Sequence, residues 1–159
     1  MFTGALASSF YGVARTTVDI DVVVRVSAKS QRVMLVSALR QAGLRVDDKK
    51  IDAAMKSDYR IATFSNSESP YSVDIILSLG TRLEKRAGAI AGLPTFYQTP
   101  EDLILAKLRM IKVTVPRERA VKDEEDVRAI LRFAVVDVDS VRKRAKQEDT
   151  LSIFESLKP

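Results

Sequence analysis

The sequence of 159 residues contains no cysteine and no histidine, and these two absences narrow the chemistry open to it. Without cysteine there is no disulfide, no thiolate nucleophile and no zinc-cysteine site. Without histidine, the commonest general base and the commonest metal ligand are both missing. Any catalysis must therefore rely on carboxylates, lysine, arginine, hydroxyl groups or a bound metal ion.

Long apolar runs are absent as well. Stretches such as Val22–Val24 and Leu103–Ala106 fall far short of the roughly 20 residues that a membrane-spanning helix needs. Residues 1–10 lack a basic region followed by an apolar run, so we expect no secretory signal, no membrane partner and a cytoplasmic location. Aromatic residues make up only 6%, which disfavours a plain RNA-binding domain, because single-strand binding depends on stacking.

What the chain does contain is typical of one globular domain. Apolar residues make up 46% and charged residues 30%, and the length suits a single core. The formal charge of +5 favours a polyanionic partner such as a nucleotide or RNA. A solvated basic surface explains the same charge equally well.

The periodicity of apolar residues predicts strands first and helices later. Strands are expected at Val18–Val26, Arg60–Phe64 and Tyr71–Leu77, with a hairpin turn between the last two and a short edge strand at Gly92–Phe96. Helices are expected at Ser27–Ala42, at Thr81–Ala91 and from Thr99 to the end. We therefore predict an α+β fold, a small mixed β-sheet flanked by helices, with residues 1–98 as the α/β core and residues 99–159 as a helical part packed on it in a single domain.

Asp19 and Asp21 are separated by one residue within a predicted strand, so both side chains lie on the same face. Adjacent carboxylates repel unless a cation lies between them, and a hard cation such as Mg²⁺ is the usual partner. The spacing therefore suggests a metal site. The alternative is that these aspartates are exposed and pair with Arg15 or Arg25.

Asp74 interrupts a second apolar strand, where an acid is expected only beside a site or a partner charge. If this strand lies next to Val18–Val26, three carboxylates converge, enough for the metal of a phosphoryl-transfer centre. An ion pair of Asp74 with Arg60 is the alternative.

Small residues from Gly4 to Ser9 precede these acids, and a helix beginning there would let backbone N–H groups approach phosphates. The order Gly4-Ala5-Leu6-Ala7, Tyr11-Gly12, Arg15-Thr16-Thr17 and Asp19-Ile20-Asp21-Val22 resembles the opening of the polymerase-β-like nucleotidyltransferases, above all their minimal and abortive-infection (AbiEii-like) toxin-antitoxin type. The similarity continues through Tyr97–Leu108 and the charged segment that ends with Lys122–Val127.

The resemblance implies a role for each matching residue. Asp19, Asp21 and Asp74 would bind Mg²⁺ or Mn²⁺, with Asp74 also as the catalytic base, and an NTP would be the substrate. The positions implied to contact the nucleotide are Gly4, Ser8, Arg15 and Thr17. Lys107 and Asp123 match positions implicated in catalysis in the toxin branch.

The residues themselves also single out Lys107 and Asp123. Thr99 and Pro100 predict a helix start, after which Lys107 shares a face with apolar residues and needs an anionic partner such as a triphosphate. Asp123 lies on the apolar stripe of the next helix. The alternatives are a Lys107 side chain that reaches solvent, and intrahelical pairs of Arg119 with Asp123 and of Lys122 with Asp126.

The resemblance therefore implies a transferase that moves an NMP from an NTP to a hydroxyl of RNA, for instance tRNA, of a protein or of a small molecule, within a toxin-antitoxin system. The alternative is a catalytically inactive nucleotidyltransferase-like module that binds a partner protein, such as a cognate antitoxin or toxin, or a nucleic acid. Ala5, where the family has glycine or serine, and the short stretch before Gly4 favour this alternative.

Overall fold

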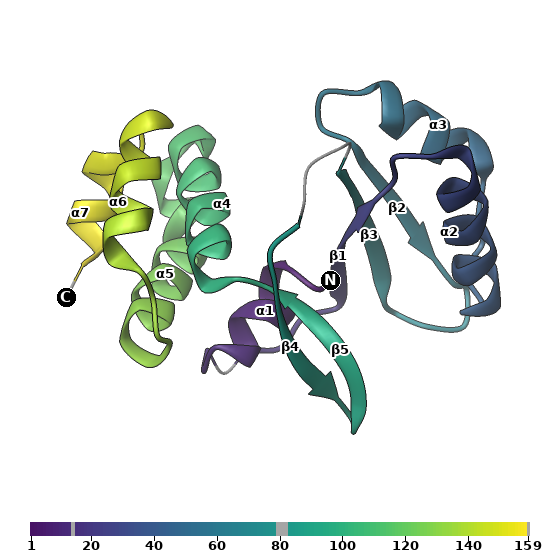
Figure 1. Ribbon diagram of the computed structural model, residues 1–159, viewed down its shortest axis with the longest axis horizontal. Coiled ribbons are helices and arrows are strands. Elements are labelled where there is room, and N and C mark those ends of the chain that lie inside the picture. The colour runs from purple at the N-terminus through teal and green to yellow at the C-terminus, as the bar shows by residue number, and fades with distance from the viewer. Residues whose placement is uncertain (14, 79–82, 159) are drawn as a thin grey trace. The chain divides into compact units, whose positions relative to one another are not determined.

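The computed structural model describes residues 1–13, 15–78 and 83–158 (Figure 1). The chain divides into two compact units. The sheet unit comprises Met1–Leu6 and Thr16–Phe96, and the helical unit comprises Ala7–Arg15 and Tyr97–Pro159. Helix α1 (Gly4–Phe10) begins in the sheet unit and ends in the helical unit.

A three-stranded mixed sheet organises the sheet unit. Its strands are β1 (Asp19–Arg25), β2 (Ile61–Ser65) and β3 (Ser72–Ser78), in the order β1-β3-β2. Strand β3 runs parallel to β1 and antiparallel to β2. All three strands and the hairpin between β2 and β3 were predicted from the sequence, and the expected neighbour relation of β1 and β3 is observed.

Two helices cover one face of this sheet, α2 (Lys29–Gln41) and α3 (Asp48–Lys56) (Figure 1). Their buried residues pack on alternate residues of the strands, among them Ala62, Phe64, Ile75 and Leu77. Helix α3 was not predicted. Asp47 starts it, because its side chain accepts a hydrogen bond from the backbone N–H of Lys49.

The predicted helix Thr81–Ala91 is wrong over its described part. Residues 85–90 form strand β4 (Lys85–Ile90), which pairs with β5 (Leu93–Gln98), while Thr81 and Arg82 lie outside the described residues. Ala91 and Gly92 join the two strands with φ of 49° and 79°. Two consecutive positive φ values are typical of the tight hairpin turns that match the twist of paired strands, so the turn overrides the helix propensity of the segment.

Four helices form the helical unit together with the end of α1. They are α4 (Pro100–Val113), α5 (Val121–Phe133), α6 (Val138–Gln147) and α7 (Leu151–Leu157), with a 3-10 turn over Arg117–Ala120. The predicted start of α4 is observed, since the Thr99 side chain accepts a hydrogen bond from the backbone N–H of Asp102. Among the described residues, no helix has the length and apolar character to cross a membrane.

Candidate functional site

The face of the sheet opposite α2 and α3 carries the predicted carboxylates. Val22 and Val24 of β1 pack against the helix-covered core, so the period of two turns Asp19 and Asp21 to the other face. The register pairs Asp21 with Asp74, and therefore Asp74 lies on that face as well. This surface, which we call the carboxylate face, comprises Asp19, Asp21 and Asp74 with the hydroxyl residues Thr63 and Ser72.

Asp21 and Asp74 are direct neighbours across β1 and β3. Adjacent strands lie about 4.8 Å apart, which leaves two carboxylates within Coulombic reach of each other. Hydroxyl groups, and not arginines, bind Asp19 and Asp74. Ser72 Oγ donates a hydrogen bond to Asp19 at 2.6 Å, and Thr63 Oγ1 donates one to Asp74 at 2.6 Å. The alternative pairing of Asp74 with Arg60 is not what the structure shows.

Gly4 brings the start of α1 against Asp21. The backbone of Gly4 has a φ of 57°, and a Cβ atom at this position would come within 2.0 Å of Asp21 Oδ2. The preceding residue, Thr3, donates its backbone N–H to the carbonyl oxygen of Asp21 at 3.0 Å. Only glycine fits both the left-handed conformation and the close approach.

The oxygen donors of the carboxylate face suit a hard divalent cation. In the described ranges, however, no group of three or more acidic side chains is arranged so that it could hold a metal ion. Two of the three carboxylates are turned towards hydroxyl groups instead. The assignment of Asp19, Asp21 and Asp74 as metal ligands therefore stays a prediction.

Thr17 shapes the entry into β1. Its Oγ1 donates to the carbonyl oxygen of Asp19 at 3.0 Å and accepts from the backbone N–H of Asp19 at 3.1 Å. Such a local turn fixes the backbone just before the first carboxylate. The hydroxyl is thus engaged with the chain itself, and its predicted contact with a nucleotide stays a prediction.

A second cluster lies in the helical unit and centres on Asp126. The Lys107 side chain is 7% exposed, and its ammonium group forms ion pairs with Asp126 and, at 3.0 Å, with Asp123. Asp126 itself is 2% exposed. These contacts replace the intrahelical pairs that were the alternative for Asp123 and Asp126, and the Lys107 ammonium does not reach solvent.

Two residues that were predicted to contact the nucleotide also bind Asp126. Ser8 is fully buried and donates its hydroxyl to Asp126 Oδ2 at 3.2 Å. Arg15 forms an ion pair with the same oxygen and keeps 27% of its side chain exposed. We call the set Ser8, Arg15, Lys107, Asp123 and Asp126 the Asp126 cluster.

Sequence reasoning missed the central role of Asp126. A signal was present, because Asp126 adjoins Val127 and precedes Ile130 by four residues, which turns it towards the buried side of α5. A buried carboxylate on such a stripe needs cationic partners. The two cations, Arg15 and Lys107, balance the charges of Asp123 and Asp126.

No family model matches the chain, and no curated protein matches it. The chain is similar, however, to several solved structures. The solution structure of the antibiotic-resistance factor ANT(2'')-Ia aligns with a TM-score of 0.66 at 17% identity, over 98% of this chain and 85% of that one. The crystal structure of ANT(2'')-Ia in complex with adenylyl-2''-tobramycin gives 0.61 at 17% identity, over 98% and 86%. An antigenic nucleotidyltransferase-like protein from Paracoccidioides brasiliensis gives 0.56 at 12% identity, over 99% and 84%.

These similarities span nearly the whole chain, so both units take part in them. The chain has the fold of these nucleotidyltransferases, and the predicted α+β class with a small mixed sheet flanked by helices is confirmed. At such low identities the similarity establishes the fold and not the activity.

Proposed function

We propose that this chain is a Mg²⁺-dependent nucleotidyltransferase, which transfers an NMP from an NTP to an acceptor hydroxyl. The observation that carries the proposal is the pairing of Asp21 with Asp74 on the face of the sheet opposite α2 and α3, beside the glycine at the start of α1. Two neighbouring carboxylates supply oxygen ligands for a hard divalent cation, and the start of α1 lies against one of them. The nucleotidyltransferase fold supports the same reading.

In this proposal Asp19, Asp21 and Asp74 are the residues that would hold the metal. The bound Mg²⁺ supplies neutralisation of the phosphate charge. Asp74 would accept the proton of the acceptor hydroxyl, while the hydroxyl oxygen forms a bond to the α-phosphorus and the bond to the β-phosphate breaks, so that pyrophosphate leaves. Gly4 lets the start of α1 lie directly against Asp21, and the strands keep the carboxylates aligned.

Lys107 and Asp123, predicted as catalytic, act indirectly in this proposal. The Lys107 ammonium is buried and already bound to two carboxylates, so it is not free to contact a triphosphate. We infer that these residues keep Asp126 in position, and that Asp126 in turn orders Arg15. The Arg15 side chain is 27% exposed, and its predicted contact with a nucleotide stays a prediction.

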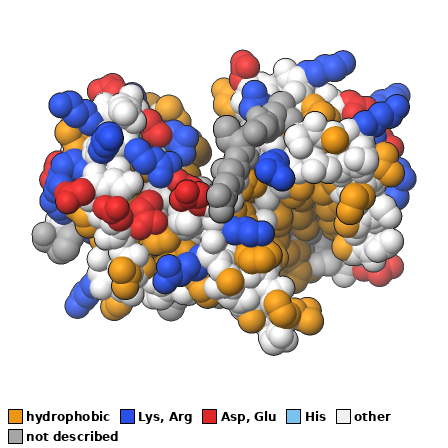
Figure 2. All heavy atoms as spheres, in the orientation of Figure 1, with side chains coloured by type: hydrophobic (Ala, Val, Ile, Leu, Met, Phe, Trp, Pro, Cys, Tyr) orange, Lys and Arg blue, Asp and Glu red, His pale blue; other side chains and the backbone are white. Residues whose placement is uncertain are grey.

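The acceptor is proposed to be a hydroxyl of a small molecule. The support comes from ANT(2'')-Ia, whose crystal structure holds adenylyl-2''-tobramycin. RNA receives less support, because on the face of the helical unit drawn in Figure 2 acidic and basic side chains are interleaved and form no continuous basic stripe. Transfer to tRNA or protein, and a toxin-antitoxin setting, stay predictions.

The proposal is tested by incubating the chain with each α-labelled NTP and Mg²⁺, in separate reactions with a pool of small polyhydroxylated molecules, with total tRNA and with cell protein. We expect label transfer by the wild type, and a loss of about 100- to 10,000-fold in Asp74→Asn. Asp58→Asn is the matched control, since Asp58 is an exposed carboxylate of the same unit that lies outside the carboxylate face. Equal rates for Asp74→Asn and Asp58→Asn would contradict the role of Asp74.

The inactive nucleotidyltransferase-like module is the second candidate. It is favoured by the absence, within the described residues, of three acids arranged around a common metal position. Calorimetric titration with each NTP in Mg²⁺ separates the two candidates. The enzyme requires Mg²⁺-dependent binding that is lost in the Asp19→Ala, Asp21→Ala double variant, whereas the same heat signal in wild type and double variant favours the inactive module.

A further inference from the structure

Two of the three carboxylates on the carboxylate face are each held by a hydroxyl group of the neighbouring strand. Asp74 lies opposite Thr63 of β2 and accepts its hydrogen bond through Oδ1. Asp19 lies opposite Ser72 of β3 and accepts a hydrogen bond in the same way. Both oxygen–oxygen distances are 2.6 Å, which is typical of a hydroxyl that donates to an ionised carboxylate. The same contact is therefore built twice, with donors from two different strands.

Each of these hydrogen bonds engages one carboxylate oxygen and leaves the other. An ionised carboxylate accepts through both oxygens, so a single donor does not use up its capacity. In the part of the chain that is described, Oδ2 of Asp19 and Oδ2 of Asp74 accept no hydrogen bond and form no ion pair. Each carboxylate is thus anchored through Oδ1, while Oδ2 can bind a ligand.

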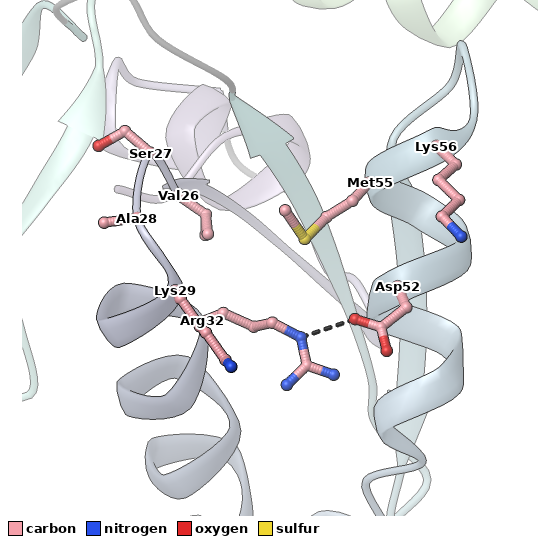
Figure 3. A pocket seen from close by; sticks show the side chains of 8 residues that line it. All are labelled: Val26, Ser27, Ala28, Lys29, Arg32, Asp52, Met55 and Lys56. Carbon is pink, nitrogen blue, oxygen red and sulfur yellow. Dashed lines mark hydrogen bonds and ion pairs between the residues drawn. The ribbon is translucent and has the colours of Figure 1, made fainter.

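The hydroxyl donors orient the carboxylates without neutralising them. Asp52 of α3 shows the alternative, since its carboxylate binds the Arg32 guanidinium at 2.6 Å and its charge is compensated (Figure 3). A hydroxyl group carries no charge, and within the described ranges neither Asp19 nor Asp74 forms an ion pair. The negative charge of both side chains is therefore available to a cation.

We propose that Thr63 and Ser72 are positioning residues of the metal site, which hold the side chains of Asp74 and Asp19 in one rotamer each and leave Oδ2 for the cation. This inference rests on the proposed function, because it concerns the same site. Residues that hydrogen-bond to metal ligands orient them, and their loss typically weakens metal binding. A purely structural pair across two strands would stabilise the sheet and leave metal binding unchanged.

The first test follows the aspartate rotamers and needs no metal ion. Three-bond couplings from the backbone nitrogen and carbonyl carbon to the carboxyl carbon report χ1 in solution, and we expect one rotamer for Asp19 and one for Asp74 in the wild type. Thr63→Val keeps the branched shape and removes the hydroxyl, so it should release Asp74 alone. Ser72→Ala should release Asp19 alone. A single Asp74 rotamer in Thr63→Val, or a single Asp19 rotamer in Ser72→Ala, overturns the proposal.

The second test measures binding of Mn²⁺ alone, followed by the broadening of the amide signals of Asp21 and Asp74. The double variant Thr63→Val, Ser72→Ala should bind Mn²⁺ about 10- to 100-fold more weakly than the wild type. Thr63→Ser keeps the hydroxyl and should bind as the wild type does. Ser65→Ala is the matched control, because Ser65 is exposed on the same side of β2 as Thr63 and its hydroxyl makes no hydrogen bond with a described residue.

The outcomes separate the role of the hydroxyl groups from the metal site itself. Equal Mn²⁺ affinity in the wild type and the double variant overturns the role of Thr63 and Ser72 and leaves the metal site in place. A loss in Ser65→Ala as large as that in the double variant also overturns it, because the effect would not depend on the two contacts. If the wild type binds no Mn²⁺, the metal site of the proposed function fails together with the inference.

Discussion

Gly4 illustrates how a single residue constrains the carboxylate face. Its φ of 57° lies in the left-handed region, and the position of a Cβ atom would overlap the Asp21 carboxylate. Gly92 has a similar φ of 79°, but a Cβ atom there meets nothing within 4 Å. Both glycines have a left-handed backbone conformation, but only Gly4 has another side chain close to the position of a Cβ atom. Comparing them therefore separates backbone strain from steric overlap.

Gly4→Ala is expected to lower the free energy of unfolding by about 2 to 5 kcal/mol, because left-handed strain adds to overpacking against Asp21. Gly92→Ala should cost only the strain, about 1 to 2 kcal/mol. Urea denaturation of both variants measures the difference. Equal losses would mean that the contact between Gly4 and Asp21 has no energetic weight.

At the scale of helices, α6 and α7 are joined by a charged contact. Arg142 donates from Nε to Glu155 Oε1 at 2.9 Å, and Lys158 donates to the other oxygen at 3.2 Å. The hydrogen bond from Arg142 and then that from Lys158 hold the pKa of Glu155 below its ordinary value. A carboxyl whose pKa is lower in the folded than in the unfolded state stabilises the fold above the unfolded pKa, and this contribution is lost as the pH falls through the folded pKa.

The variant Glu155→Gln should therefore unfold at a lower urea concentration than the wild type at neutral pH. The gap should close as the pH falls below about 4.3, the ordinary pKa of glutamate, since the wild-type carboxyl becomes protonated. Glu118→Gln is the control, because Glu118 is exposed and makes no ion pair with a described residue. A gap that stays constant down to acid pH would show that the packing of residue 155, and not its charge, joins the helices.

The elements differ in how well the sequence predicted them. Strand β1 and the start of α4 were predicted because alternation of apolar residues and an N-cap threonine are local signals. Helix α3 was missed although Asp47 and the buried Ile51 and Ala54 carry a local signal for it. Strand β4 was mistaken for a helix because its residues favour helix in isolation, and only the pairing with β5 makes it a strand.

The whole molecule consists of two compact units, and the Asp126 cluster belongs to one of them. Removing one partner of a buried ion pair leaves a buried charge without compensation, which typically costs about 3 to 5 kcal/mol. Asp126→Asn leaves Lys107 with Asp123 alone. The cost should be concentrated in the helical unit.

We therefore expect Asp126→Asn to accelerate hydrogen exchange in α4 and α5 while β1 and β3 keep their protection, measured by exchange and mass spectrometry of peptides from each unit. Asp139→Asn is the control, because the Asp139 side chain is 92% exposed and an ion pair at the surface contributes little to stability. If β1 and β3 lose protection as much as α4 and α5, the two units unfold as one.

The sequence alone determined the face on which Asp19 and Asp21 lie, because alternation along a strand is a local property of the backbone. Tertiary structure decided that Asp21 faces Asp74, since register depends on which strands pair. It also decided that Arg15 binds Asp126, 111 residues away in the sequence. The physical reason is the same in both cases: side-chain partners across long separations follow from packing of whole elements, which no short pattern of residues contains.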